Sequence, residues 1–224
     1  MAHSPAEIVE AGYDVMAEEY LAYAAATIGD PLQRFLDKLM SHLPDGSDVV
    51  DLGCGAGIPS TQALAQRHSV LGVDISASQL RLAGRHVPGA EFLKADFAEL
   101  DLPSASCDAV TAFYSMTHVP REKHAQLLRR IASWLRPGGF VLLTLSARGE
   151  TDGIHDFVGV PMYFSGYGPD TNREMLLTAG FKVVADEIVS IQEPDVEASF
   201  QWLLARRNAS RGALRSTNGP ALLR

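Results

Sequence analysis

The chain has 224 residues, of which 46% are hydrophobic and 21% charged, and its formal net charge is −8. This length suits one α/β domain with an appendage, and the composition is ordinary for a soluble globular protein. The acidic balance argues against nucleic acid as a partner, because binding a phosphate backbone usually needs a basic face.

The sequence also argues against a metal site, a leader peptide and a membrane span. Cys54 and Cys107 are the only cysteines, and their spacing fits no metal site, so we expect two reduced thiols and no metal. The N-terminus lacks the basic and then apolar pattern of a signal peptide, and no apolar run approaches the ~20 residues of a membrane helix. We therefore expect a cytoplasmic monomer or homodimer.

Residues 1–43 predict a helical cap. Tyr13, Met16, Tyr20 and Tyr23 fall three or four residues apart, so one helix would carry them on a single face. A second helix begins at Asp30-Pro31, carries its apolar residues on one side, and ends before Pro44.

From residue 48 the pattern alternates between strand and helix, which predicts βαβ crossovers and a parallel sheet with helices on both faces. Strands are expected at 48–52, 69–74, 90–95, 107–113 and 139–146, and helices at 59–67, 77–86 and 121–135.

The C-terminal third is more varied. Residues 147–170 predict an irregular insertion, and a loop of this length is usually functional. A capping box at Thr171–Glu174 predicts a helix over 172–179, and alternating runs at 181–191 and 198–206 predict a terminal hairpin. Residues 207–224 have no hydrophobic periodicity, and we expect this tail to be disordered.

The run Val49 to Ile58 (VVDLGCGAGI) places three glycines at alternate positions directly after a strand. Glycine allows a tight turn and lets a ligand lie against the backbone. The dinucleotide fingerprint is G-x-G-x-x-G, but here Ile58 occupies the place of its third glycine. This spacing argues against a nicotinamide-dependent oxidoreductase.

Acidic residues follow the next two strands. Asp74 ends the second strand, where a carboxylate either accepts the two hydroxyls of a ribose or caps the following helix. Asp96, followed by Phe97, ends the third strand and either binds a base or belongs to a turn.

The order and spacing of these motifs resemble the class I methyltransferases that use S-adenosylmethionine (SAM). The matching segments are residues 49–57, Asp74, Asp96-Phe97, 107–110 and 135–139, with Tyr13, Ala17 and Tyr20 resembling the lid of that family. The resemblance extends from about residue 10 to residue 206. It implies a three-layer α/β sandwich with a seven-stranded, mostly parallel sheet whose last strand is antiparallel. It also implies a catalytic domain over 44–206, a lid over 1–43 and a substrate lid at 147–170.

The resemblance assigns the SAM site residue by residue. The turn of Gly53, Cys54, Gly55 and Gly57 would hold the methionine part of SAM, with Asp51 and the main-chain carbonyl of Phe113 near its ammonium group. Asp74 would bind the ribose, assisted by Gln79. The adenine would be held by Ile75, Asp96 and Phe97, and Tyr20 would close over the cofactor from the lid.

The segment Ala112 to Pro120 contains the first candidate for a general base. Relatives often carry Asn-x-x-x-His-His-Val-Pro here; His118 matches, whereas Phe113 and Thr117 depart from the pattern. Histidine titrates near neutrality, as a base must. His118 is thus the first catalytic candidate and His155, in the insertion, the second, although each could equally be a packing or surface residue.

Aromatic and apolar residues from three segments are expected to meet above the methyl group and to bind a small, largely apolar or aromatic acceptor. They are Tyr13, Tyr114, Met116, Phe157, Met162, Tyr163, Phe164 and Tyr167. The sequence lacks the Asn/Asp-Pro-Pro-Tyr/Phe signature of enzymes that methylate DNA adenine or protein glutamine. The interpretation favoured by these features is methylation of an O or N atom of a small molecule, in secondary metabolism. A SAM-binding protein with non-methylating catalysis or a regulatory role is the alternative, and a nicotinamide oxidoreductase is a more distant one.

Overall fold

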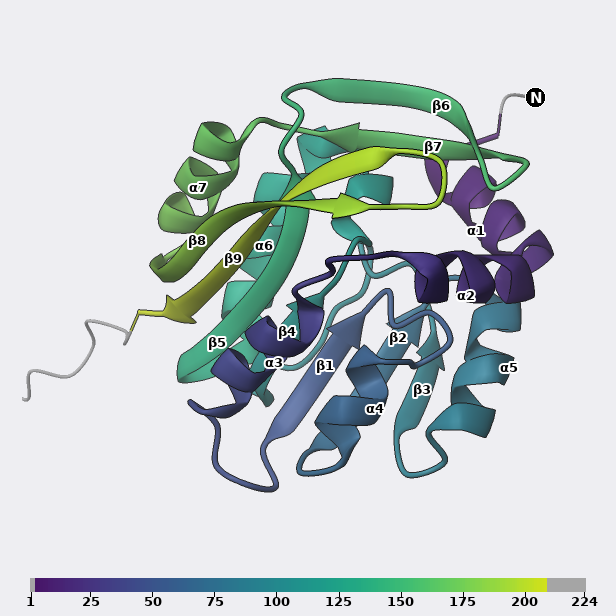
Figure 1. Cartoon of the computed structure of the whole chain (residues 1–224). Coiled ribbons are helices and arrows are strands. Elements are labelled where there is room, and N and C mark those ends of the chain that lie inside the picture. Colours follow the sequence, from purple (N-terminus) through teal and green to yellow (C-terminus); the bar gives the residue numbers. More distant parts are fainter. Residues whose placement is uncertain (1–2, 209–224) are drawn as a thin grey trace, which may run out of the picture.

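A computed structural model describes residues 3–208 and contains a seven-stranded sheet in the order β3-β2-β1-β4-β5-β9-β8 (Figure 1). The strands from β3 to β5 pair in parallel, whereas β9 pairs antiparallel with both β5 and β8. The predicted fold is therefore confirmed, including the antiparallel last strand. The strands are β1 (Asp48–Leu52), β2 (Ser69–Asp74), β3 (Glu91–Lys94), β4 (Cys107–Ala112), β5 (Leu135–Ser146), β8 (Phe181–Gln192) and β9 (Glu197–Arg207).

The central strands are buried on both faces because their side chains alternate between two cores. In β5, Val141 and Leu143 belong to one core, and Phe140 and Leu142 to the other. Helices α3 (Leu32–Met40) and α4 (Ser60–Ala65) cover the second core, while α6 (Arg121–Trp134) and α7 (Pro169–Thr178) cover the first. Helix α5 (Ala77–His86) packs against β2 and β3.

The N-terminal cap contains two helices before α3, where the sequence predicted one. Helix α1 (Pro5–Val15) ends at Met16, which is also the N-cap of α2 (Ala17–Ala26). Met16 is almost fully buried, so packing holds the break in place. The predicted single helix is therefore wrong, yet Tyr13, Tyr20 and Tyr23 still line one cavity.

The insertion after β5 is an ordered hairpin, so the prediction of an irregular loop is wrong. Strands β6 (Thr151–Phe157) and β7 (Val160–Gly166) pair antiparallel through a two-residue turn at Val158-Gly159. In Figure 1 the hairpin lies with α1 and α2 beyond the carboxyl ends of the parallel strands. The insertion therefore covers the edge at which open α/β sheets bind ligands.

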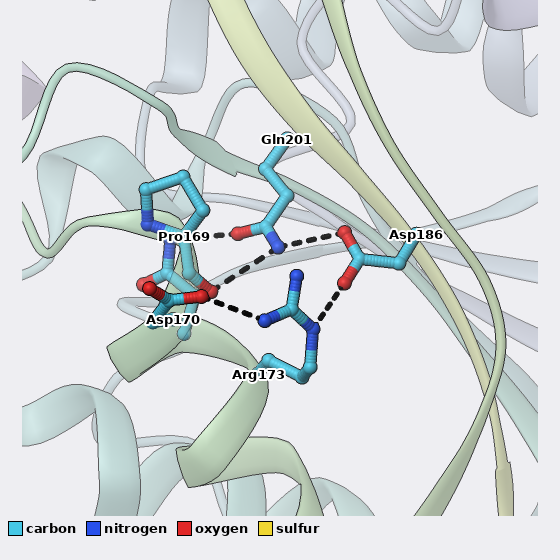
Figure 2. Close-up of polar contacts among 6 residues, drawn as sticks. Pro169, Asp170, Arg173, Asp186 and Gln201 are labelled. Atoms are coloured by element: carbon cyan, nitrogen blue, oxygen red, sulfur yellow. Dashed lines mark hydrogen bonds and ion pairs between the residues drawn. The ribbon is translucent and has the colours of Figure 1, made fainter.

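A polar cluster near the base of this hairpin joins the first turn of α7 to β8 and β9 through Arg173, Asp186 and Gln201 (Figure 2). The Asn172 Nδ2 atom donates to the carbonyl oxygens of Ser146 (3.1 Å) and Tyr167 (3.3 Å), which lie just before and just after the insertion. Gln201 of β9 accepts from the same amide and donates to Asp186 of β8. The predicted start of this helix is wrong: Gly168 is the N-cap of α7 and Pro169 its first residue, so Asn172 lies inside the helix with its side chain turned to the core.

The cap and the sheet edge are joined by a short antiparallel bridge. Ile28 and Gln192 exchange two backbone hydrogen bonds of 2.9 Å, which connects the α2–α3 linker to the end of β8. Within residues 3–208, no helix is long and apolar enough to cross a bilayer. The predicted tail at 207–224 lies outside the described residues apart from Arg207 and Asn208.

Candidate functional site

Two neighbouring cavities open at the carboxyl ends of the strands, and four side chains belong to both. The smaller cavity has a volume of about 60 Å³ and the larger about 480 Å³. The shared residues are Tyr13, Tyr20, Tyr114 and His118. These side chains form the boundary across which two bound molecules would meet.

The glycine turn forms one wall of the smaller cavity. Gly53 (φ +71°) and Gly55 (φ +54°) line it, and a Cβ on Gly53 would collide with Ser115. Gly57 has a different role, since a Cβ there would lie 3.2–3.3 Å from Ala83 and Val87 of α5. The first two glycines keep the cavity open, and the third allows a helix to pack closely.

Asp74 connects the glycine turn to the start of α5. One carboxylate oxygen accepts from the Gly55 amide at 2.9 Å and the other from the Ser76 amide at 2.8 Å. Burial raises the pKa of Asp74 to about 6, and the two amide donors counter this effect. The N-cap of α5 is Ser76, whose hydroxyl accepts from the Gln79 amide, so Asp74 does not cap the helix itself. Asp74 orders the turn and lines the cavity, and its binding of a ribose stays a prediction.

Gln79 is the least satisfied polar side chain of the smaller cavity. It is 1% exposed, it lines the cavity, and within the described residues neither atom of its amide group has a hydrogen-bond partner. An unpaired buried amide costs roughly 1–3 kcal/mol, so a ligand that pairs with it gains this free energy back. Gln79 therefore points to a polar ligand in the smaller cavity.

The other residues expected at the cofactor divide into two groups. Ile75, Phe97 and Phe113 line the smaller cavity, as do Val9 and Ser115, which the sequence analysis missed. Asp51, Cys54 and Asp96 line neither cavity.

Asp51 and Asp96 bind protein groups instead. The buried Asp51 carboxylate accepts from the hydroxyls of Ser60, Thr61 and Thr111, and so joins β1, α4 and β4. Asp96 accepts from the Ala98 amide at 2.9 Å, as a turn residue does. The Cys54 side chain packs away from the cavity, next to Gly72. For these three residues, direct ligand contacts through the side chain stay predictions.

His118 is held in one tautomer. It lies at the end of a short 3₁₀ helix (Met116–His118) after β4. Its Nδ1 atom is 2.8 Å from the carbonyl oxygen of Tyr163, which can only accept, so Nδ1 carries the proton. Its Nε2 atom then accepts from the Tyr13 hydroxyl at 2.9 Å. Burial lowers the pKa of His118 to about 4, so the ring is neutral at physiological pH and, in the ligand-free protein, a weaker base than the near-neutral titration expected from the sequence.

The larger cavity contains part of the predicted acceptor site. Of the residues predicted there, Tyr13, Tyr114, His118, His155, Phe157 and Phe164 line it. Met116 and Met162 are fully buried in hydrophobic clusters and line neither cavity, so their contact with an acceptor stays a prediction. Tyr163 contributes its carbonyl oxygen to His118, whereas its hydroxyl donates to Asp152.

Much of the larger cavity was missed by the sequence analysis. Its remaining wall comes from the α2–α3 linker, the end of β5 and the β8–β9 hairpin, including Asp30, Arg148, Glu193 and Phe200. Helix α2 also contributes Tyr23 to this wall, and the sequence had indicated that residue by its helical spacing from Tyr20. The others have no local motif, because the fold brings them together from distant segments.

Comparison with known proteins places residues 49–139 in a family described as "Methyltransferase domain". Among curated proteins, the chain is 34% identical over 178 residues to 27-O-demethylrifamycin SV methyltransferase from Amycolatopsis mediterranei. The match covers 75% of this chain and 59% of that protein. Across the first curated relatives the matched share of their own length is 32–59%, so the chain spans less than two thirds of each.

Two solved structures show the same fold over nearly the whole chain. 1,6-Didemethyltoxoflavin-N1-methyltransferase from Burkholderia thailandensis has a TM-score of 0.69 at 20% identity, with 93% of this chain and 92% of that chain covered. The [4+2]-cyclase SpnF has a TM-score of 0.71 at 17% identity, with 93% and 98% covered.

Proposed function

Since the chain belongs to the class I SAM-dependent methyltransferase family, we propose that it transfers the methyl group of SAM to a small molecule bound in the larger cavity. The observation that carries this proposal is the boundary of Tyr13, Tyr20, Tyr114 and His118 that both cavities share. A methyl donor in one cavity and an acceptor in the other would face each other there. The division into a lid (1–43), a domain (44–206) and a substrate lid (147–170), and the cytoplasmic location, remain part of this proposal.

The lining of the smaller cavity supports SAM as its ligand, and the cavity must widen from its volume of about 60 Å³ when SAM binds. Gln79 offers an unpaired amide and Asp74 a carboxylate, which suit the ribose hydroxyls. Ile75 and Phe97 offer apolar surfaces for the adenine, and the open face of the Gly53 turn fits the methionine part. When bound, SAM supplies a methyl group on a sulfonium whose thioether is a good leaving group without protonation.

The residues of the boundary would align the acceptor and exclude water. Tyr13 and His118 would also take a proton from an acceptor that carries one. The acceptor proton moves to the Tyr13 oxygen as the Tyr13 proton moves to Nε2 of His118, and the imidazole ends with both nitrogens protonated. The Tyr163 carbonyl holds the ring in the orientation that this relay needs. His155, whose ring lies 6.3 Å from that of Phe164 in the larger cavity, is the second candidate base.

An O or N atom of a largely apolar or aromatic molecule is the acceptor that we favour. The aromatic lining of the larger cavity supports this class. The names of the similar proteins refer to an O-demethylated rifamycin and to N1 of a didemethyltoxoflavin, which is in keeping with a role in secondary metabolism.

The test is to incubate the purified protein with SAM and a panel of phenols, aromatic amines and heterocycles, and to follow S-adenosylhomocysteine (SAH). We expect SAH to form with at least one compound class, and the Tyr13→Phe variant to form it more slowly. Tight SAM binding with no turnover on any compound would instead favour the alternative of a non-methylating SAM protein. The observation that favours this alternative is that a [4+2]-cyclase has the same fold as this chain. Thermal stabilisation by NAD but not by SAM would favour an oxidoreductase.

A further inference from the structure

Two carboxylates from distant parts of the chain lie in the wall of the larger cavity. Asp30 belongs to the α2–α3 linker, and Glu193 follows β8. The backbone bridge between Ile28 and Gln192 brings these two segments together. The proposed mechanism uses neither carboxylate, so their presence in the cavity needs another explanation.

Each carboxylate is only half satisfied by the protein. Asp30 Oδ1 accepts from the Tyr114 hydroxyl and the Leu32 amide, both at 2.9 Å, and Glu193 Oε2 accepts from the Tyr23 hydroxyl at 3.1 Å. Within residues 3–208, Asp30 Oδ2 and Glu193 Oε1 make no hydrogen bond. Asp30 is exposed and Glu193 half-buried, so their free oxygens are open to the cavity, while partial burial raises the pKa of both groups. Each free oxygen can therefore accept from a donor bound in the cavity.

The cations around the cavity do not neutralise this pair. Arg148 lines the cavity, but its guanidinium donates to the main-chain oxygen of Glu197 and forms no ion pair with either carboxylate. Arg148 offsets part of the charge of Glu193, since it lowers the pKa of that group, whereas no cation does so for Asp30. His118 is neutral. The described wall thus has a negative balance.

Aromatic rings line the same cavity as the two carboxylates. Phe157 packs edge-on against Tyr23 at 5.4 Å and against Phe164 at 5.5 Å between ring centroids, and Tyr20 lies at 6.1 Å from it. All four residues line the larger cavity. The faces of such rings attract cations, most strongly where water is excluded.

From these contacts we propose that the acceptor carries a protonated amine, which Asp30 and Glu193 bind as an anchor in the larger cavity. This proposal rests on the proposed function, and it narrows the acceptor to aromatic molecules that carry an aliphatic amine and a second nucleophilic atom. An ammonium nitrogen has no lone pair, so the anchored amine is not the atom that is methylated. The methylated atom is a second nucleophile of the same molecule, placed near Tyr13 and His118.

The test uses the SAH-loaded protein and sets of matched probes. Phenyl, indolyl and naphthyl scaffolds each carry a two-carbon arm that ends in an amine, an alcohol or a carboxylic acid, and binding is measured by calorimetry. We expect the amine to bind about tenfold more tightly than the alcohol on at least one scaffold. A hydrogen bond to a charged group contributes enough free energy to change a binding constant by about this factor. The acid should bind no more tightly than the alcohol.

Asp30→Asn and Glu193→Gln should each reduce the advantage of the amine and leave alcohol binding unchanged, because both variants keep an acceptor for the neighbouring tyrosine. Glu197→Gln is the matched control: this exposed residue does not line the cavity, so the amine should keep its advantage. SAH affinity equal to that of the wild type shows that each variant is folded.

The inference is overturned if the acids bind as tightly as the amines or if no amine binds at millimolar concentration. It is also overturned if the variant that combines Asp30→Asn and Glu193→Gln still prefers the amine. The SAH titration separates this failure from a failure of the proposed function. A protein that binds SAH without preferring amines contradicts only the anchor, whereas a protein that binds no SAH contradicts the proposed function itself.

Discussion

The main-chain carbonyl of Tyr163 lies 2.8 Å from Nδ1 of His118, so the inserted hairpin determines which imidazole nitrogen carries the proton. The second nitrogen faces the Tyr13 hydroxyl of α1. Two segments outside the central sheet, the hairpin and the cap, thus orient one histidine at the boundary between the cavities.

Replacing His118 by Ala should lower kcat by about a hundredfold or more if the residue receives the acceptor proton. General base catalysis typically accelerates a reaction by at least this factor. SAM affinity should change by only a few-fold, because the ring binds Tyr13 and Tyr163 instead of the glycine turn. Steady-state kinetics and calorimetry with SAH measure the two quantities. Equal losses in both would assign His118 a structural role, and His155→Ala serves as the comparison for the second candidate base.

The free energy of unfolding should depend on pH through two opposing groups of the ligand-free protein. His118 has a pKa lowered from 6.5 to about 4, so between these values the unfolded chain binds a proton that the native chain does not. Stability from this group therefore rises with pH across that window, by about 3 kcal/mol. Asp74 has a pKa raised from 3.8 to about 6, so its contribution falls with pH across nearly the same window and by a similar amount.

Chemical denaturation between pH 4 and pH 7 separates these two contributions. The stability of His118→Gln relative to the wild type should worsen steadily as the pH rises, while that of Asp74→Asn should improve. Differences that do not vary with pH would contradict the assigned pKa directions.

Replacing Gln79 by Leu should weaken SAM binding without destabilising the ligand-free protein. The amide of Gln79 is buried and has no partner within residues 3–208, so its removal takes away a desolvation cost and no hydrogen bond. We expect SAH affinity to fall about tenfold and the melting temperature to stay constant or rise. A lower melting temperature with unchanged affinity would show that Gln79 supports the fold instead. Asp74→Ala is the contrasting variant: it should lower both quantities, because Gly55 and Ser76 lose their acceptor.

Replacing Asn172 by Ala should remove the hydrogen bonds that hold the two ends of the hairpin segment together. Its amide holds the carbonyls of Ser146 and Tyr167, and we expect a loss of about 1–3 kcal/mol in stability and a higher KM for the acceptor. Asp170→Asn is the control within the same cluster (Figure 2). Its ion pair with Arg173 is fully exposed on the Asp170 side, so this change should have almost no effect. An equal response of the two variants would contradict the role of Asn172.

The central sheet could be predicted because its signals are local. Each parallel strand is a short apolar run followed by a turn and a helix, and the observed strands agree with the expected ones within two residues, apart from the early start of β5 at Leu135. The glycine turn and Gln79 lie a few residues after the ends of β1 and β2. Short-range spacing was therefore enough to predict that they lie at this edge of the sheet.

The hairpin β6–β7 could not be predicted, because its turn uses an unexpected residue. Val158 and Gly159 both have positive φ, 52° and 78°, as a two-residue hairpin turn of this kind requires. Asn-Gly or Asp-Gly would have signalled such a turn, whereas a β-branched residue rarely adopts this conformation. Tertiary contacts of β7 with His118 and Val119 stabilise the hairpin in place of turn propensity.

The hydrogen-bond partners of Asp51 could not be predicted from the sequence either. An acidic residue before the glycine turn suggested a partner for the ammonium group of SAM. Three hydroxyls, contributed by α4 and β4, surround the carboxylate, and their convergence depends on the packing of elements up to 60 positions apart.

The two cavities draw on different stretches of the chain. Every residue that lines the smaller one lies between Val9 and His118, whereas the wall of the larger one continues to Phe200. A ribosome therefore completes the whole lining of the smaller cavity before it begins residues 146–200. For the same reason, substitutions after position 145 replace none of the residues that line the smaller cavity, although the hairpin still orients His118 through Tyr163.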